Sequence, residues 1–422
     1  MIDYQTNRHF ALAMDAEDPL AEFRNRFHLP KTRSGEDCVY LCGNSLGPMP
    51  KTARAHVEQE LSDWERLAVD GHVKAKNPWT TYHERFTRQL AGLVGAKPVE
   101  VVAMNTLTVN LHLMMVSFYR PTPQRHKVVM EANAFPSDQY AVRSQIAVHG
   151  YDPATSLVEL HPRPGEATLR TEDMEAYLRE HGESVALVLL GVVNYYTGQA
   201  FDLQRLTQAA QARGCVIGFD LAHAVGNLLL RLHEWQVDFA VWCSYKYLNA
   251  GPGAVAGCFV HEHHGDARDL PRFAGWWGHD QSRRFLMEPA FQPIFGAEGW
   301  QLSNPPILSM APLKAALDLF DEVGMPRLRA KSELLTGYLE FLLNQFGGDM
   351  LTIITPADKA QRGAQLSLRV RNNGRALFQA LLARHFICDW REPDVIRVAP
   401  APLFNTFLDV YRFAGAVRGS LL

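Results

Sequence analysis

The chain has few cysteines, no long apolar run and no excess of charge of one sign. Its six cysteines are scattered over 422 residues. Scattered cysteines do not make a disulfide framework and are typical of reduced thiols in a cytosol. The longest apolar run, residues 185–193, is far too short to cross a bilayer. Because the first residues also lack a secretory signal pattern, we expect a cytoplasmic protein without a membrane partner.

Net charge and composition further limit the kind of protein this can be. The net charge is −3, so no basic field favours a nucleic acid as partner. The apolar fraction of 47% and the charged fraction of 21% are ordinary for a globular protein of two or three domains. Three histidines, His261, His263 and His264, cluster in a polar turn. A solvated loop is favoured over a metal site there, and no metal is expected.

Short apolar runs alternate with helical patterns along most of the chain. This alternation predicts an α/β fold with a mostly parallel seven-stranded sheet and helices on both faces. The strand candidates are residues 99–104, 127–131, 157–160, 186–190, 215–219, 239–242 and 255–260.

A change in pattern marks the C-terminal part. A helical pattern over 310–323 ends at Gly324, and further helices follow with strand candidates at 366–370 and 395–398. We therefore expect a large domain over 51–323 and a smaller α+β domain over 324–422. An N-terminal segment, 1–50, is expected to pack with the small domain.

Asp220 and Lys246 each follow an apolar strand candidate. Ligands of open α/β sheets bind beyond the carboxyl ends of such strands, where both groups emerge. This pair suits pyridoxal phosphate (PLP), since a lysine can form a Schiff base with its aldehyde and an aspartate can pair with its pyridinium nitrogen. His223, three residues after Asp220, is a candidate to lie beside the ring. A surface ion pair and a structural histidine remain the alternatives.

A phosphate needs a helix N-terminus, where free backbone N–H groups face the anion. The best candidate is the start of the apolar helix at Leu107 and Thr108, directly after the first strand candidate. Tyr245, next to the lysine, can add a hydroxyl. The alternative for this threonine-rich start is an ordinary helix cap.

The loop after strand 127–131 carries Phe135, Pro136, Ser137 and Asp138. Phe135 is placed to stack on a flat cofactor, and Ser137 or Asp138 opens the next helix. A buried loop aromatic with an ordinary cap is the alternative interpretation.

Arg397 lies between β-branched neighbours in the last strand candidate. An arginine there is a good bidentate partner for a substrate carboxylate. The alternative is a charge on an edge strand that faces water.

Taken in order, these segments resemble the kynureninase family, within fold type I of the PLP enzymes. The Gly-Trp-Trp-Gly-His segment at 275–279 and Trp-Arg-Glu-Pro at 390–393 are specific to that family, whereas the Asp220 motif is shared more widely. The matching segments are 40–47, 135–138, 193–198, 220–224, 244–253, 275–279, 303–306 and 389–393.

The resemblance implies a set of roles around PLP. Lys246 would hold the cofactor and move the substrate's α-proton, and Asp220 would pair with the pyridine nitrogen. Tyr245 would act as an acid or base at the substrate carbonyl. The other implied cofactor residues are Leu107, Thr108, Phe135, Pro136, Ser137, Asp138, His223 and Tyr245, with Trp276 and Asn304 supplied by the second subunit of a homodimer.

The implied substrate site and reaction follow from the same family. Arg397 would bind the α-carboxylate, Asn44 and Ser45 would border that pocket, and Trp276 and His279 would contact the aryl ketone. The reaction would be hydrolytic cleavage of the Cβ–Cγ bond of L-kynurenine or 3-hydroxy-L-kynurenine, in tryptophan catabolism and pyridine-nucleotide biosynthesis. The products would be anthranilate or 3-hydroxyanthranilate, and L-alanine.

Three positions depart from the family pattern: Cys42 replaces an aspartate, Leu107 a small polar residue and Gly191 a more polar one. These departures bear on substrate preference more than on the type of reaction. The alternative function is that of a cysteine desulfurase-like β-lyase, which needs a mobile nucleophilic cysteine. A non-catalytic cofactor-binding protein is disfavoured because the lysine and the aspartate are both present.

Overall fold

The computed structural model describes residues 2–266, 268–348 and 350–421. Its larger sheet has seven strands in the order β4-β10-β9-β8-β7-β5-β6, in which β10 is antiparallel to both of its neighbours and the other pairs are parallel. The expected mostly parallel seven-stranded sheet is confirmed. Its strands are β4 (Val101–Ala103), β5 (Lys127–Glu131), β6 (Leu157–Leu160), β7 (Val185–Gly191), β8 (Val216–Asp220), β9 (Phe239–Trp242) and β10 (Gly257–Val260).

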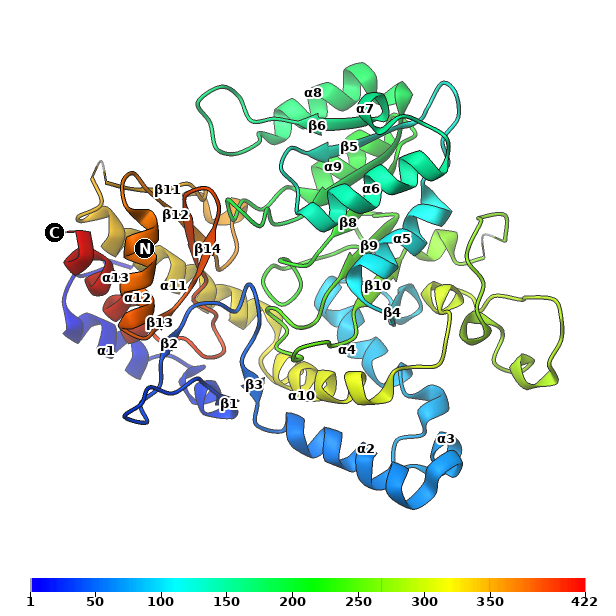
Figure 1. Cartoon of the computed structure of the whole chain (residues 1–422), viewed down its shortest axis with the longest axis horizontal. Helices are drawn as coiled ribbons and strands as arrows, with labels where there is room; N and C mark the ends of the chain where they lie inside the picture. Colours follow the sequence, from blue (N-terminus) through cyan, green and yellow to red (C-terminus); the bar gives the residue numbers. More distant parts are fainter. Residues whose placement is uncertain (1, 267, 349, 422) are drawn as a thin grey trace.

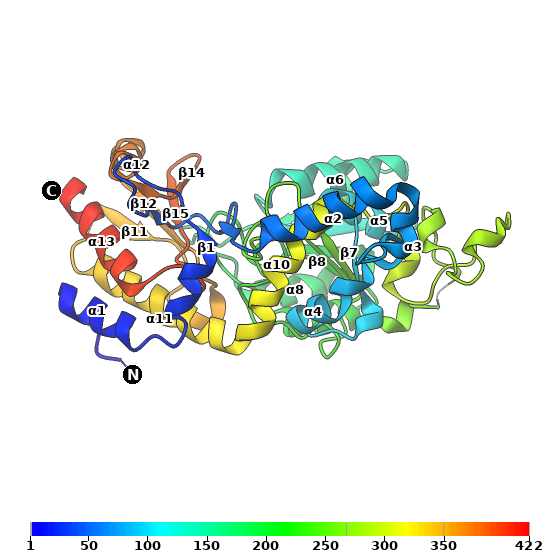
Figure 2. The same ribbon diagram turned by 90° about the horizontal axis from the view of Figure 1, so that it is seen from below.

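Helices cover both faces of this sheet because its strands are apolar on both sides. In β7, Val188 and Leu190 belong to one core, whereas Leu187 and Leu189 belong to the other. α2 and α10 lie side by side along the sheet in both views (Figures 1 and 2). The helices of this part are α2 (Ala53–Leu67), α3 (Gly71–Lys74), α4 (Glu84–Val94), α5 (Leu107–Phe118), α6 (Pro136–Val148), α7 (Pro153–Ser156), α8 (Thr171–His181), α9 (Leu203–Gln211) and α10 (Ile307–Val323).

A second, four-stranded sheet lies in the C-terminal part, with the antiparallel order β11-β12-β15-β14. β12 and β15 lie at the residues that the sequence predicts as strands. The sequence does not predict the two short strands beside them, β11 and β14. The elements here are α11 (Met325–Asn344), β11 (Leu351–Ile353), β12 (Leu366–Val370), α12 (Gly374–Ala383), β13 (Phe386–Ile387), β14 (Asp389–Arg391), β15 (Val395–Val398) and α13 (Phe407–Leu421).

The N-terminal residues pack against this C-terminal part. α1 (Arg8–Ala16) contacts α13, and β2 (Val39–Tyr40) pairs in parallel with β13. Both chain termini therefore lie beside the smaller sheet (Figure 1). The last short pair is β1 (Phe27–His28) with β3 (Met49–Pro50). Within the described ranges, none of the helices combines the length and apolar character that a membrane crossing requires.

Candidate active site

A cavity opens at the carboxyl ends of β5, β7 and β8, as expected for an open α/β sheet. Its empty space is about 550 Å³, including the solvent in its mouth. The cavity brings together most of the residues that the sequence singles out, together with five that it does not. The lining residues are Leu107, Thr108, Glu131, Phe135, Ser137, Asp138, Gly191, Val193, Tyr195, Asp220, Ala222, His223, Tyr245 and Lys246.

Lys246 lies on the turn that follows β9. Its Nζ is 3.1 Å from Nε2 of His223, and it lies 5.7 Å from the ring centre of Phe135. The turn is held by backbone hydrogen bonds, since the Asn249 N–H donates to the Lys246 carbonyl and the Gly47 N–H donates to the Tyr245 carbonyl. The lysine is therefore presented to the cavity from a fixed backbone.

His223 is buried and uncharged. Burial, followed by the positive charges of Lys246 and Arg397, holds the pKa of its imidazole well below the usual range. A neutral ring that accepts a hydrogen bond from Lys246 through Nε2 carries its own proton on Nδ1. That Nδ1 is buried and has no hydrogen-bond partner among the described residues, so it is available to a ligand.

Two buried aspartates, Asp138 and Asp220, face the cavity together. Burial raises the pKa of Asp220, while Asp138, the charge of Lys246 and the Ala222 N–H, which donates to it at 2.6 Å, act in the opposite direction. Burial and the neighbouring Asp220 carboxylate hold the pKa of Asp138 well above its usual range. The pKa of Asp138 is therefore raised more strongly than that of Asp220, and Asp220 is the member of the pair that loses its proton first.

Glu131 is a third buried carboxyl group in the cavity, and sequence reasoning missed it. Burial raises the pKa of Glu131 to about 8. The backbone N–H of Gly191 donates to both of its oxygens, at 3.2 and 3.3 Å. A Cβ atom at position 191 would lie 2.9 Å from one of those oxygens, so the unusual glycine leaves room for Glu131.

Two helices begin at the cavity, α5 at Leu107 and α6 at Pro136. The hydroxyl oxygens of Thr108 and Ser137 lie 2.8 Å apart between them. Thr106, the residue directly before α5, is the threonine for which an ordinary helix cap was the alternative. Among the described residues no side chain caps the start of α5, so that cap is absent. Two hydroxyls beside two helix N-termini make a suitable site for a phosphate.

Tyr245 lies beside the lysine, with its ring centre 5.9 Å from Nζ of Lys246. Burial raises the pKa of its phenol, and the nearby Cys243 thiol adds to the shift. The hydroxyl is therefore protonated at neutral pH and able to donate a hydrogen bond.

Arg397 is buried in the middle of the four-stranded sheet, between β12 and β14, so the alternative of an edge-strand charge in water is wrong. Its Nε lies 2.6 Å from Oδ1 of Asp389, and its Nη2 also pairs with that carboxylate. Nη1 donates to the carbonyl of Tyr195, a residue that lines the cavity, at 2.8 Å. These contacts place the guanidinium next to the cavity and use only three of its five N–H groups.

The N-terminal loop reaches the same region. Asn44 is fully buried, and its side-chain amide donates to Gln365 at 3.0 Å. Its Oδ1 has no partner among the described residues. Gln365 in turn donates to the Tyr195 carbonyl, and Ser45 follows Asn44 as a partly buried residue. Burial raises the pKa of the neighbouring Cys42 thiol to about 12, which keeps it protonated.

Seven predicted site residues do not line the cavity of this chain. They are Arg397, Asn44 and Ser45, described above, and Pro136, Trp276, His279 and Asn304. Trp276 is 42% exposed and donates from its indole nitrogen to the Arg284 carbonyl. His279 is buried and accepts from the Gln292 N–H, and Asn304 is exposed. The segment that holds Trp276 and His279 extends from the large sheet on the side away from the smaller sheet (Figure 1).

The residues present fit PLP. The cavity supplies a lysine, an aspartate, an aromatic ring and a phosphate site. Buried polar atoms without partners among the described residues, His223 Nδ1 and Asp138 Oδ1, are of the kind that a polar ligand satisfies.

Comparison with known proteins agrees with this geometry. The family model described as "Kynureninase C-terminal domain" matches residues 328–417. A kynureninase of Koribacter versatilis is 59% identical over 97% of this chain and 97% of its own length. A kynureninase of Myxococcus xanthus is 59% identical over 99% and 98%.

Solved structures show the same fold. An apo cysteine desulfurase from Thermococcus onnurineus aligns with a TM-score of 0.76 at 16% identity, covering 91% of this chain and 94% of that one. A C-DES variant with glycine covalently linked to its PLP cofactor aligns with a TM-score of 0.75 at 17% identity, over 90% and 96%. At such low identity the likeness shows the fold alone. The identity to the curated relatives over nearly the whole chain shows that this chain belongs to the kynureninase family of PLP-dependent enzymes, and the residues of the cavity fit that cofactor.

Proposed function

We propose that this chain hydrolyses L-kynurenine, 3-hydroxy-L-kynurenine or both, between Cβ and Cγ, releasing L-alanine and the aryl acid. The observation that carries the proposal is the set of three groups around one cavity: Lys246, Asp220 and the buried Arg397 beside Tyr195. These are a covalent anchor, a partner for a ring nitrogen and a partner for an amino-acid carboxylate.

PLP bound in this cavity would store the electrons released at the substrate's α-carbon. Asp220 would pair with the ring nitrogen, because Asp138 beside it holds its own proton more strongly. Thr108 and Ser137 would hold the phosphate at the helix N-termini. Phe135 would cover one face of the ring, and His223 would lie beside it as a neutral donor.

Lys246 would hold the cofactor and supply the base that removes the substrate's α-proton. Its Nζ lies within hydrogen-bond distance of Nε2 of the neutral His223, which would hold the amine in position beside the substrate. Tyr245, protonated at neutral pH, donates a hydrogen bond to the substrate's γ-carbonyl while water adds there.

Arg397 binds the α-carboxylate. Three of its five N–H groups serve Asp389 and the Tyr195 carbonyl, which leaves the rest of the fork for the substrate. Asn44, whose Oδ1 is unpartnered, borders the same pocket with Ser45.

The complete site includes residues of a second subunit. Trp276 and Asn304 lie outside the cavity of their own chain, and Trp276 is half exposed. A homodimer accounts for this placement. Each subunit would contribute its Trp276 and Asn304, together with the nearby His279, to the cavity of its partner. Closed twofold dimers are also the commonest assembly for soluble oligomers.

The division into a segment 1–50, a large domain over 51–323 and a small domain over 324–422 belongs to the same proposal. It is supported by separate apolar cores, one built on the smaller sheet and the others on the two faces of the larger sheet. A cytoplasmic location is likewise part of the proposal. It is supported by six free cysteines and by the absence of a membrane-spanning helix among the described residues.

The desulfurase alternative is not favoured. All six cysteines are buried, whereas that chemistry needs an accessible thiolate on a mobile loop. Steady-state kinetics of the holoenzyme with L-kynurenine, 3-hydroxy-L-kynurenine and L-cysteine test the proposal. We expect alanine and an aryl acid from at least one kynurenine and no sulfide from cysteine. Sulfide release without kynurenine turnover contradicts it.

A further inference from the structure

Three side chains that could bind a metal, Asp238, His263 and His264, meet at the end of the large sheet opposite the cavity. Asp238 directly precedes β9, and the two histidines follow β10 in a short 3-10 turn, Glu262–His264. Because β9 and β10 are antiparallel, with Val260 opposite Phe239, the end of β10 lies beside the start of β9. The sequence favours a solvated loop here because the two histidines are adjacent in the chain but Asp238 is far from them. Only the pairing of β9 with β10 brings the carboxylate of Asp238 to the histidines.

The three ligand atoms are closely spaced. Nε2 of His264 lies 2.8 Å from Oδ1 of Asp238, and Nε2 of His263 lies 3.4 Å from the same oxygen. The two Nε2 atoms are 2.7 Å apart. The atoms therefore form a compact triangle of two imidazole nitrogens and one carboxylate oxygen.

No arrangement of protons gives every contact of this triangle its own hydrogen bond. A neutral imidazole nitrogen either carries one proton and donates it or offers one lone pair. If both Nε2 atoms are protonated, two N–H groups oppose each other across 2.7 Å. If only His264 Nε2 is protonated, its single N–H is shared between Asp238 and His263, and the lone pair of His263 faces Asp238 across 3.4 Å. A cation bound by all three atoms removes this competition.

A zinc ion can reach all three atoms. Zn–N and Zn–O bonds are about 2.0–2.2 Å long, and a point at that distance from all three atoms lies about 1 Å outside their plane. For tetrahedral angles, the two shorter sides of the triangle must widen on binding to about 3.3 Å, which the third side already has. A water molecule can occupy the fourth, outer position, because His263 is exposed.

Neighbouring groups hold the ligands in place. The second carboxylate oxygen of Asp238 accepts from the Ile217 N–H at 2.9 Å, which turns Oδ1 toward the histidines. The ring of His264 packs edge-to-face on Phe118 at 4.9 Å. Such supporting contacts are typical of metal ligands.

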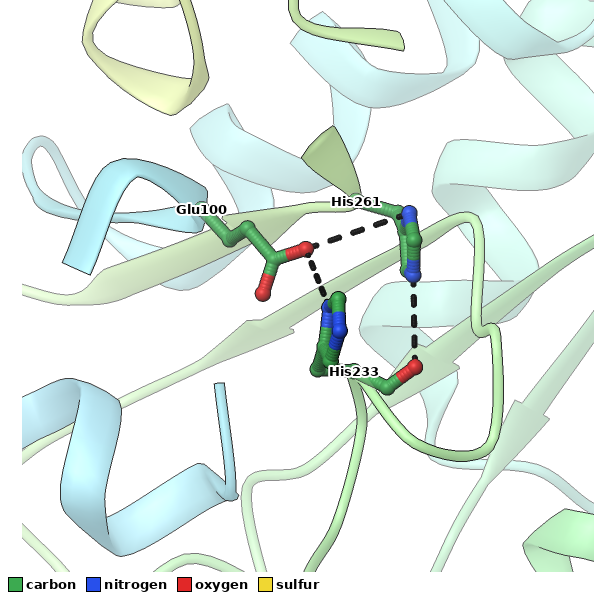
Figure 3. Close-up of side chains that lie close together, drawn as sticks. All are labelled: Glu100, His233 and His261. Carbon is green, nitrogen blue, oxygen red and sulfur yellow. Dashed lines mark hydrogen bonds and ion pairs between the residues drawn. The ribbon is translucent and has the colours of Figure 1, made fainter. Parts of the chain in front are cut away.

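An adjoining cluster of Glu100, His233 and His261 has its hydrogen bonds satisfied without an ion. Glu100 accepts from His233 Nδ1 at 2.8 Å and from the Glu262 N–H at 2.9 Å, and His261 Nε2 lies 3.2 Å from the His233 carbonyl (Figure 3). The His263 N–H donates to the remaining His261 nitrogen at 3.3 Å. Each donor there has an acceptor, so this cluster needs no ion.

We propose that Asp238, His263 and His264 form a zinc site that ties the start of β9 to the end of β10. Zinc prefers this mixture of imidazole and carboxylate ligands. Lys246 lies beyond the opposite end of β9, so the ion does not touch the catalytic groups. It acts on stability and not on turnover.

The test is zinc titration of the holoenzyme after dialysis against a chelator. We expect one zinc per chain with micromolar affinity and, at a hundredfold excess over Kd, a Tm rise of about 3 °C with kcat unchanged. His263→Ala/His264→Ala and Asp238→Asn should each weaken binding at least tenfold, whereas His233→Gln should keep it.

Cobalt(II) gives a second readout, since three protein ligands and water produce the intense visible bands of a four-coordinate ion. The proposal is overturned if the unmodified holoenzyme binds no zinc below about 100 μM. It is equally overturned if the double histidine variant binds as tightly as the parent, or if binding is lost in His233→Gln instead.

Discussion

Arg397 and Asp389 face each other across neighbouring strands β15 and β14, and the buried guanidinium pairs with both oxygens of the carboxylate. The arginine therefore reaches the cavity already oriented. Pre-orientation lowers the entropic cost of binding a substrate carboxylate, because the side chain is not ordered by the substrate itself.

The first prediction concerns this pair. In Asp389→Asn the guanidinium loses its ionic partner and its fixed direction, so KM for L-kynurenine should rise about tenfold while kcat changes less than threefold, consistent with a lost binding contact. Arg397→Lys, which has no planar fork, should lose at least about a hundredfold in kcat/KM. Steady-state kinetics measure both. An unchanged KM in both variants would remove Arg397 from the substrate site.

The second prediction concerns Lys246→Ala. Turnover should fall by at least about a thousandfold because the anchor and the base are both lost, while the far-UV spectrum and Tm stay near those of the parent. Lys51→Ala, at an exposed lysine, is the matched control and should keep its activity. Borohydride reduction and peptide mapping of the parent should place the cofactor on Lys246, and a label on another lysine contradicts the assignment.

The third prediction separates the two aspartates. The pKa of Asp138 is raised more strongly than that of Asp220, so Asp220 is the better partner for a positively charged ring nitrogen. Asp220→Asn should therefore reduce kcat far more than Asp138→Asn, with cofactor content retained in both. A loss of less than tenfold in Asp220→Asn, about 1.4 kcal/mol of barrier, would show that this carboxylate is not the partner of the ring nitrogen.

The fourth prediction is a pH dependence of stability. Burial raises the pKa of Glu131 to about 8 from an ordinary value near 4.5. The folded protein therefore favours protonated Glu131, and the stability tied to that proton is fully present below about pH 4.5 and lost as pH rises through 8. Glu131→Gln mimics the protonated acid and should remove this loss.

Urea unfolding of the cofactor-free protein at pH 5.5 and pH 8.5 measures the effect. Relative to the parent, Glu131→Gln should be more stable at pH 8.5 by on the order of a few kcal/mol, and by clearly less at pH 5.5. The exposed Glu183→Gln is the control and should show no such difference. Equal effects of Glu131→Gln at both pH values contradict a raised pKa.

The fifth prediction tests the shared site. Lys246→Ala and a Trp276→Ala/Asn304→Ala double variant should each be inactive alone. After subunit exchange, a mixture should recover activity, because one site of each hybrid dimer contains both an intact lysine and intact partner residues. At equal amounts the recovery should approach about a quarter of the parent activity, since half of the dimers are hybrids. Verified exchange without recovery means that each chain builds its own site.

The sequence alone determined the framework of the molecule. β5, β6, β9, β12 and β15 lie at the residues that the apolar runs predict, because a strand buried on both faces is marked by its own local composition. The turn residues around Lys246 and the strand-end position of Asp220 are local signals of the same kind. Residue types and their order were therefore enough to predict the cavity, its cofactor and the family.

Only the tertiary structure decided which side chains meet. Glu131 contacts Gly191, Arg397 contacts Asp389, and Asp238 meets two histidines that follow another strand. The short strands β11 and β14 also formed without a signal of their own, through pairing with longer strands, and β13 formed through pairing with the equally short β2. A periodic pattern states which face of an element is buried but not what packs against it. Partners far apart in the chain, their protonation and any metal between them therefore depend on strand order and register.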